Sequence, residues 1–468
     1  MKLSYSKAFT KVIDACQSLV GRIKLNSFQM DKSKYRFIKV LVISYVFSHV
    51  VFFALNNRFL TGSYFLAPDE EGYVEMFRRA QSDELNICWG FPCHTSRAEL
   101  LVLYLPATLF KLLGLSDLSA TRLQSSLFVL ISYLLLAFTL ERINRLFRFV
   151  IPLTIFIPTF FIWSSLALRE SFIYLSLALV IFGITSIRKG KKWTGFIALY
   201  AGLLMISSVK EYLFIVIAVS IIIMGFYFIL IRKKCLESLT FHLLSIVLVL
   251  LSNVGLFSSI HSQVKSVISG QTIASNVLNQ NSVTPDSANT TSKRLQELNE
   301  KQERSRLLDL ANKFILEELS TVSESGTLPE SGTLPESRMQ PQEPINKLSL
   351  KAAGWLDFKG VFLAGMNIIW HPSIFLDYPS RTLEIVSFET PIWTVLILGT
   401  MLVGILGLFR KNLSMEQVFA LVFVLIYLYT MTLYTINVGT MVRHRSNFLI
   451  PTLVVLAQAL PHRSSRKT

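Results

Sequence analysis

Long apolar stretches alternate with short polar ones along most of this chain. Runs of roughly 20 residues with almost no charge recur from position 37 to position 461. An α-helix of that length crosses the hydrocarbon core of a bilayer. The pattern therefore predicts an all-α polytopic membrane protein.

Basic clusters between the apolar runs predict how the spans are oriented, because Lys and Arg accumulate in cytoplasmic loops. Clusters lie at 32–39, 142–148, 188–192, 232–234 and 410–411, and in the tail after Pro461. Placing all of them inside predicts about ten spans with both termini cytoplasmic. The predicted spans are 37–55, 121–140, 149–165, 170–187, 193–209, 212–231, 239–258, 388–409, 415–435 and 446–461.

The same map divides the chain into five parts. They are a basic cytoplasmic segment 1–37, a transmembrane core 38–258, an external polar loop 259–387, C-terminal helices 388–461 and a cytoplasmic tail 462–468. A first external loop, 57–120, lies within the core. The long, basic N-terminus is not followed by a small-x-small site, so we do not expect a cleavable signal.

Two further apolar stretches are predicted to lie at the membrane surface instead of crossing it. If 98–115 spanned the bilayer, the basic cluster 142–148 would fall on the wrong side. We expect an interfacial or re-entrant helix there, broken by Pro106 and Lys111. The same reasoning makes 361–376 interfacial.

The segment 259–352 is polar and contains the tandem "ESGTLPESGTLPES". It predicts a flexible linker beside a charged helix at 292–320. Cys88 and Cys93 fall in the first external loop. They form a disulfide there, remain reduced thiols, or bind zinc with His94, for which no second ligand pair is visible.

The composition agrees with a membrane location and argues against nucleic-acid binding. The chain is 52% hydrophobic and 16% charged, with a mean hydropathy of +0.50. Its net charge of +16 is spread over short clusters between spans, without a continuous basic face. We therefore expect membrane lipids, and no nucleic acid, among its partners.

Several charges sit at span ends on the predicted external face, where the positive-inside bias does not explain them. Charges near hydrocarbon are costly and are usually paired or functional. The group comprises Asp69, Glu70, Glu71, Arg169, Glu170, Lys210, Glu211, Arg443, His444 and Arg445. Together these residues favour a site for an anionic, lipid-linked substrate.

Each of these charges also has a structural explanation. Pro68 followed by acids is ordinary chemistry for a helix start, and Glu71 fits it best. Arg169–Glu170 and Lys210–Glu211 are able to pair with each other. The arginines at 443 and 445 are able to contact lipid headgroups.

The stretch "PDEEGYVEMFRRA" (68–80) resembles the first-loop motif of the GT-C glycosyltransferase superfamily. It is most similar to the protein-mannosyltransferase and aminoarabinose-transferase branch, where an Asp-Glu pair precedes a Tyr and an amphipathic juxtamembrane helix. Asp69, Glu70 and Tyr73 match that motif. The stretch 103–127 is similar to the family's second juxtamembrane helix, with Arg122 opening the second span. The stretches 157–179 and 442–460 resemble parts of bacterial family members that build surface polysaccharides.

The resemblance implies a GT-C-like fold and transfer of a sugar from a polyprenyl-phosphate donor. The acceptor is a glycan, lipid or protein at the extracytoplasmic face of the plasma (inner) membrane. Asp69 is the expected base, with Glu70 orienting the acceptor or binding a divalent cation (Mg²⁺ or Mn²⁺) if one is used. Phosphate would be held by Arg443, Arg445, Arg169 and Lys210, beside a groove formed with Tyr73, His444 and Arg122.

Two other functions are alternatives to a glycosyltransferase. A Wzy-like polysaccharide polymerase or ligase also uses external arginines and a large external loop. A lipid-linked glycan transporter would place its charges at mid-membrane and often carries repeats, neither of which is visible here. The identity of the sugar, the acceptor and the oligomeric state are not specified by the sequence.

Overall fold

The computed structural model describes residues 32–55, 69–82, 95–140, 147–232, 236–253, 256, 365–366, 368–370, 387–434 and 438–459. Backbone contacts divide the chain into one unit of Met1–His261 with Leu350–Thr468 and a second unit, Ser262–Ser349. All the described residues belong to the first unit. Within them the regular structure is entirely helical, which agrees with the predicted all-α class.

Six of the described helices are long and apolar enough to cross a membrane. They are α7 (Asp117–Thr139), α10 (Glu170–Arg188), α11 (Lys192–Val209), α12 (Glu211–Arg232), α19 (Thr390–Phe409) and α20 (Met415–Tyr434). The bent pair α8 (Phe147–Thr154) and α9 (Pro158–Ser165) would be a seventh if it forms one span. These helices support a membrane protein, whereas the predicted number of ten spans is not confirmed.

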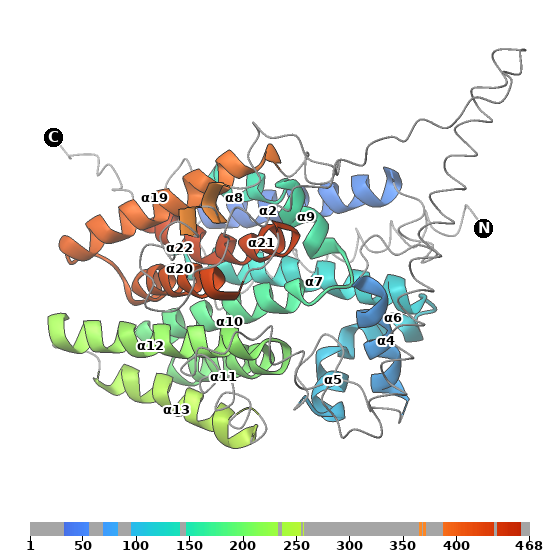
Figure 1. The fold of residues 1–468 in the computed structure, drawn as a ribbon, viewed down its shortest axis with the longest axis horizontal. Helices are drawn as coiled ribbons and strands as arrows, with labels where there is room; N and C mark the ends of the chain where they lie inside the picture. The colour runs from blue at the N-terminus through green and yellow to red at the C-terminus, as the bar shows by residue number, and fades with distance from the viewer. Residues whose placement is uncertain are drawn as a thin grey trace, which may run out of the picture. The chain divides into compact units, whose positions relative to one another are not determined.

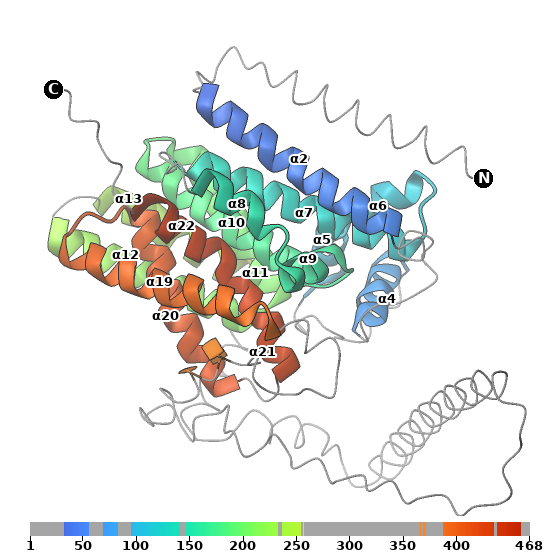
Figure 2. The same ribbon diagram turned by 90° about the horizontal axis from the view of Figure 1, so that it is seen from above.

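The remaining predicted spans are also helical in the described residues. They correspond to α2 (Lys32–Leu55), α13 (Leu236–Ser252) and α22 (Leu449–Ala459). The last is only 11 residues long and follows a 3₁₀ turn, Ser446–Phe448. The helix α2 packs along α7 and α8 (Figure 2).

The core of the bundle is built around α10, which packs against α7, α11 and α20. Glycines let α10 and α11 approach closely: a Cβ on Gly183 would lie 2.8 Å from the Gly195 carbonyl oxygen, and one on Gly202 would lie 2.8 Å from the Ser176 carbonyl oxygen. Small residues at helix contacts are typical of membrane bundles, because close van der Waals packing replaces the hydrophobic effect there.

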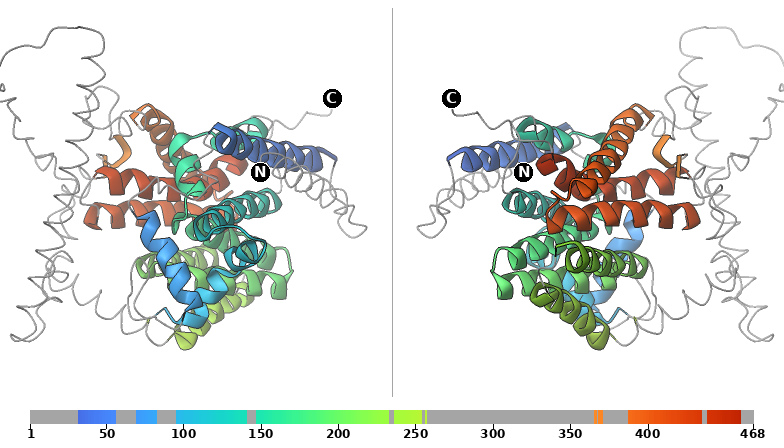
Figure 3. Two further views of the ribbon diagram at one scale, coloured as in Figure 1. Left: turned by 90° about the vertical axis from the view of Figure 1, so that its right-hand side faces the viewer. Right: turned by 90° about the vertical axis from the view of Figure 1, so that its left-hand side faces the viewer.

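Three short helices, α4 (Glu70–Gln81), α5 (Arg97–Leu103) and α6 (Leu105–Leu112), gather at one end of the bundle (Figure 1). Viewed from that end, α4 lies across the ends of the longer helices (Figure 3). In α4, Tyr73, Phe77 and Ala80 recur at helical spacing and are buried, so they form an apolar stripe that faces the core.

The segment 98–115 is broken into two helices, as predicted, but Lys111 does not break it. The interruption is at Tyr104, and Pro106 then occupies the first turn of α6, where its missing N–H is harmless. Lys111 lies within α6, which ends before Gly114, a residue at φ +89°.

Several predictions fall outside the described residues. They concern Cys88, Cys93 and His94, the segment 259–352, the basic cluster at 142 and 145, and both termini. In the predicted interfacial stretch 361–376, the structure describes only 365–366 and 368–370.

Candidate functional site

Asp69 and Glu70 are adjacent in sequence but occupy different environments. Glu70 is fully buried, and both of its oxygens lie 2.7 Å from the guanidinium of Arg122 on α7. One of these oxygens also accepts the backbone N–H of Ala167 at 3.0 Å. This fork-to-fork ion pair ties α4 to α7 and to the segment between α9 and α10.

The ion pair changes two predicted roles. Glu70 is engaged on both oxygens and shielded from solvent, so it does not fit the role of an acceptor-orienting residue or a metal ligand. Arg122 is also buried and does not line a groove. Glu70 precedes Tyr73 and Phe77 by three and seven positions, so it continues the apolar stripe of α4, a signal that predicts burial.

Asp69 stands at the N-cap position of α4 but makes no side-chain hydrogen bond to the helix start. Its side chain is 51% exposed, and its Oδ2 lies 2.5 Å from Nη1 of Arg443. Glu71 is exposed in the first turn, where a negative charge favours the helix dipole. The helix-start explanation therefore accounts for Glu71 but not for the orientation of Asp69.

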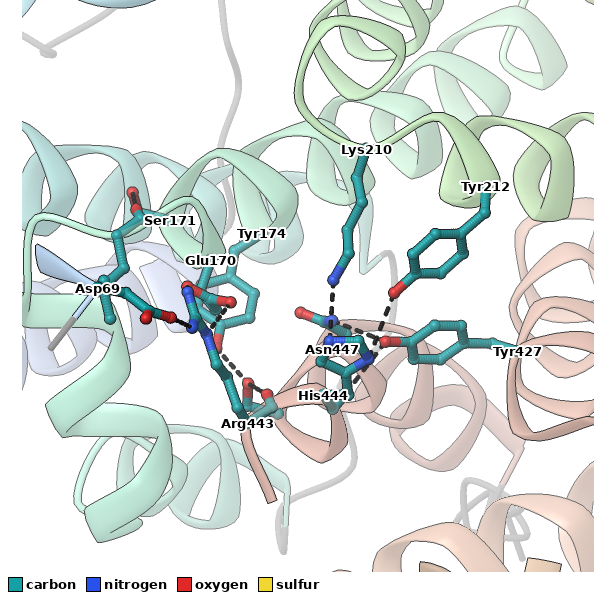
Figure 4. Close-up of polar contacts among 12 residues, drawn as sticks. Asp69, Glu170, Ser171, Tyr174, Lys210, Tyr212, Tyr427, Arg443, His444 and Asn447 are labelled. Atoms are coloured by element: carbon teal, nitrogen blue, oxygen red, sulfur yellow. Dashed lines mark hydrogen bonds and ion pairs between the residues drawn. The ribbon is translucent and has the colours of Figure 1, made fainter. Parts of the chain in front are cut away.

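Arg443, on α21 (Val438–Arg445), bridges Asp69 and Glu170. Its Nε donates to one oxygen of Glu170, and its Nη2 donates to the other at 2.9 Å (Figure 4). Its guanidinium also lies 5.8 Å from the centre of the Trp163 ring, within cation–π range. Burial disfavours the charge on Arg443, but the charge of Glu170 outweighs this and raises the pKa of the arginine.

A second polar group lies beside this bridge, around His444. Nζ of Lys210 is 2.9 Å from His444 Nε2, and the Tyr212 hydroxyl is 3.3 Å from Nδ1. The ring of His444 lies nearly parallel to that of Tyr212, at 6.4 Å between centres. Asn447 Nδ2 donates to the Tyr427 hydroxyl at 2.9 Å, next to this group (Figure 4).

Burial lowers the pKa of both Lys210 and His444. The positive charge of Arg169 lowers the pKa of each further, as does that of Arg443. Glu170 acts in the opposite direction on Lys210. The group thus resists additional positive charge in the structure as it stands.

Arg445 does not join Arg443. It is buried, and it donates to the Ile368 carbonyl at 2.8 Å and to the Thr390 hydroxyl at 3.2 Å at the start of α19. Two residues along a helix point about 200° apart, so one arginine faces the Asp69 side and the other faces α19. The two arginines were predicted to bind the same phosphate. The structure instead directs them to different partners.

Glu389, at the N-cap of α19, is a buried carboxylate that was not predicted from the sequence. Its carboxylate accepts the Thr159 N–H at 2.7 Å and the Thr159 hydroxyl, and lies 3.4 Å from Trp393 Nε1. Burial raises the pKa of Glu389, with these hydrogen bonds and the charge of Arg445 acting against the rise. The signal was a lone carboxylate beside Pro391 at the start of a 20-residue apolar run.

Tyr73 is buried among the residues of α4 and its neighbours, and its carbonyl accepts the Tyr104 hydroxyl at 3.2 Å. Burial raises the pKa of Tyr73. It therefore packs beneath Asp69 instead of lining a groove.

The pairing of Glu170 with Lys210, left open by the sequence, is replaced by the Glu170–Arg443 contact.

The site lies at one end of the bundle, and Arg188 lies at the other end of α10. The helix has 19 residues and is about 28 Å long, close to the thickness of a hydrocarbon core. Arg188 pairs there with the buried carboxylate of Glu416 on α20. The separation of the two groups of charges along α10 is as the sequence predicts, and which end is external remains a prediction.

Comparison with known proteins gives no relative: no family model, no curated protein and no solved structure matches this chain. Its function is therefore argued from the chemistry of the site.

Proposed function

We propose that this chain is a membrane glycosyltransferase that moves a sugar from a polyprenyl-phosphate donor to an acceptor hydroxyl at the extracytoplasmic face of the plasma (inner) membrane. One observation carries the proposal. A half-exposed carboxylate, Asp69, is held beside a guanidinium, Arg443, at the end of a bundle of apolar helices. A base and a phosphate-binding cation side by side are what such a transfer needs.

The reaction assigns one role to each of these residues. The acceptor oxygen attacks the anomeric carbon, its proton passes to Asp69, and the bond from that carbon to the phosphate oxygen breaks. The electron pair leaves with the phosphate, beside Arg443. Attack opposite to the leaving group inverts the anomeric configuration.

The Arg443 bridge explains how the guanidinium serves a phosphate while staying in place. Glu170 holds the Nε and Nη2 edge, whereas Asp69 holds only Nη1. A donor phosphate replaces Asp69 at Nη1, and Asp69 is then free to accept the acceptor proton. Glu170 and the Glu70–Arg122 pair are positioning residues in this scheme.

The test uses the full chain in nanodiscs with a panel of short-chain polyprenyl-phosphate hexoses and pentoses. The readout is donor consumption and the glycosylated product, measured by mass spectrometry with bacterial glycan, lipid and peptide acceptors. We expect Asp69→Asn to lower the transfer rate at least about 100-fold, the contribution of a general base. Glu71→Gln, which removes a carboxylate at an exposed neighbouring position, should leave the rate within about twofold.

Other outcomes would separate the remaining functions. Full activity of Asp69→Asn with loss in Arg443→Ala would favour a polymerase or ligase that relies on cations alone. Flux of a lipid-linked glycan without any transfer product would favour a transporter. A rate unaffected by EDTA would show that neither Mg²⁺ nor Mn²⁺ is required.

A further inference from the structure

Lys210 and His444 place two basic nitrogens 2.9 Å apart, beside the proposed phosphate position. Lys210 joins α11 to α12 and is buried, whereas His444 on α21 is only partly buried. The contact links helices 234 positions apart in sequence. It is not needed for the base or for the Arg443 bridge, so it calls for its own explanation.

The contact restricts how many protons the pair carries. If the Lys210 ammonium donates to Nε2, that ring nitrogen must be unprotonated, and Nδ1 carries the hydrogen toward Tyr212. If the ring Nε2 is protonated instead, it donates to a neutral amine. In either arrangement the pair binds one proton fewer than an ammonium and an imidazolium together, because two donors cannot share this contact.

The surroundings also disfavour an additional proton on the pair. Arg169 and Arg443 oppose further positive charge on the pair, and Glu170 is the carboxylate that favours it. Tyr212 on α12 and Tyr427 on α20 face the same group with neutral hydroxyls. A bound dianion would supply the missing negative charge.

The proposed reaction produces such a dianion and one proton. The donor is a phosphate diester with one negative charge, and the leaving group is a phosphate monoester with two. The acceptor hydroxyl loses the balancing proton. Charge and proton are therefore created together within the site.

We propose that Lys210 and His444 form a proton-coupled phosphate subsite, in which the pair takes up one proton when a phosphate monoester dianion binds. The identification of the ligand rests on the proposed function. Once His444 takes up the proton, its ring no longer accepts a hydrogen bond from Lys210. The Lys210 ammonium then donates to the phosphate instead. Release of the product then follows loss of this proton, which makes product affinity fall as pH rises.

The test measures binding of farnesyl phosphate to the full chain in nanodiscs by isothermal titration calorimetry. At pH 8.5 the ligand is a dianion, because the second pKa of a phosphate ester is about 6. Titrations in two buffers of different ionisation enthalpy then count the protons that the protein takes up. We expect about one proton per ligand and a dissociation constant that rises about tenfold per pH unit.

Three variants identify the residues. His444→Gln keeps a hydrogen bond to Lys210 but should abolish proton uptake and flatten the pH dependence. Lys210→Met should weaken binding at least about tenfold, the loss of one charged hydrogen bond. Lys189→Met, an exposed lysine at the other end of α10, should bind like the wild type.

Binding without proton uptake, uptake that persists in His444→Gln, or no binding of farnesyl phosphate would each overturn the subsite. The two proposals fail separately. Proton-coupled binding without sugar transfer from any donor would refute the proposed transferase activity and support the phosphate subsite. Transfer together with pH-independent phosphate binding would remove only the subsite.

Discussion

The Arg443 guanidinium meets the Asp69 carboxylate at 2.5 Å across 374 positions of sequence. The contact joins α21, near the C-terminal end of the described residues, to the start of α4. Glu170 holds the other edge of the same guanidinium, so Arg443 is fixed before any ligand arrives.

The adjacent carboxylates should differ in their effect on stability. Glu70→Gln leaves the buried Arg122 without its charged partner and should lower the free energy of unfolding by about 3–5 kcal/mol. Asp69→Asn changes a half-exposed group and should have little effect. Thermal unfolding of the purified protein, followed by intrinsic fluorescence, measures both. Equal melting temperatures for the two variants would contradict the assigned roles.

Removal of Arg443 should destabilise the fold because the buried carboxylate of Glu170 loses its main partner. We expect Arg443→Met to cost about 3 kcal/mol. Adding Glu170→Gln should recover much of the loss, whereas adding Asp69→Asn should not, because Asp69 is half-exposed. Unfolding free energies of the two double variants test this. A larger recovery with Asp69→Asn would show that Glu170 is not the principal partner.

Glu389 should make stability depend on pH. Its folded pKa is raised above the ordinary 4.5, so the folded state holds the proton more tightly than the unfolded state. The stabilising contribution of Glu389 is therefore fully present below about pH 4.5 and is lost as pH rises through the raised pKa. Glu389→Gln keeps the Thr159 contacts in the form of the protonated acid, so melting temperature should change less with pH. A variant whose pH profile matches the wild type would contradict this.

The glycine contacts between α10 and α11 should be intolerant of a methyl group. Gly183→Ala places a Cβ 2.8 Å from the Gly195 carbonyl oxygen and should destabilise by about 1–3 kcal/mol. Gly399→Ala is the matched control, because its nearest neighbour, a methyl carbon of Leu456, would lie at 3.7 Å. Melting temperatures of the two variants test the difference. A neutral Gly183→Ala would show that the two helices separate easily.

The helices α5 and α6 should contact lipid at the membrane surface. Six large apolar side chains along them and at the C-cap of α6 are exposed: Leu101, Val102, Leu105, Leu109, Leu112 and Leu113. A tryptophan at Leu112 should be quenched by lipids brominated near the headgroup more than by lipids brominated near the chain end. A tryptophan at the exposed polar position Glu71 should be quenched weakly. Equal quenching at both depths would point to a helix that spans the bilayer.

The sequence predicted the helices well because burial in a bilayer and helix periodicity are local properties. The apolar runs, the stripe of α4 and the break beside Pro106 all follow from the order of residues over one or a few turns. The positions of the basic clusters also predicted that Glu170 and Arg188 lie at opposite ends of α10. The predicted number of ten spans is not confirmed, since short helices such as α22 carry the same apolar composition as the longer ones.

Only the tertiary structure decided which charges meet. Asp69 and Glu70 have the same chemistry in sequence, but α4 turns one toward Arg443 and the other into the core against Arg122. Arg443 and Arg445 likewise diverge, because two steps along a helix reverse the direction of a side chain. The partners come from helices tens to hundreds of residues away, and packing selects them. Local sequence thus determined where charges lie along the helices, whereas helix packing determined their pairs.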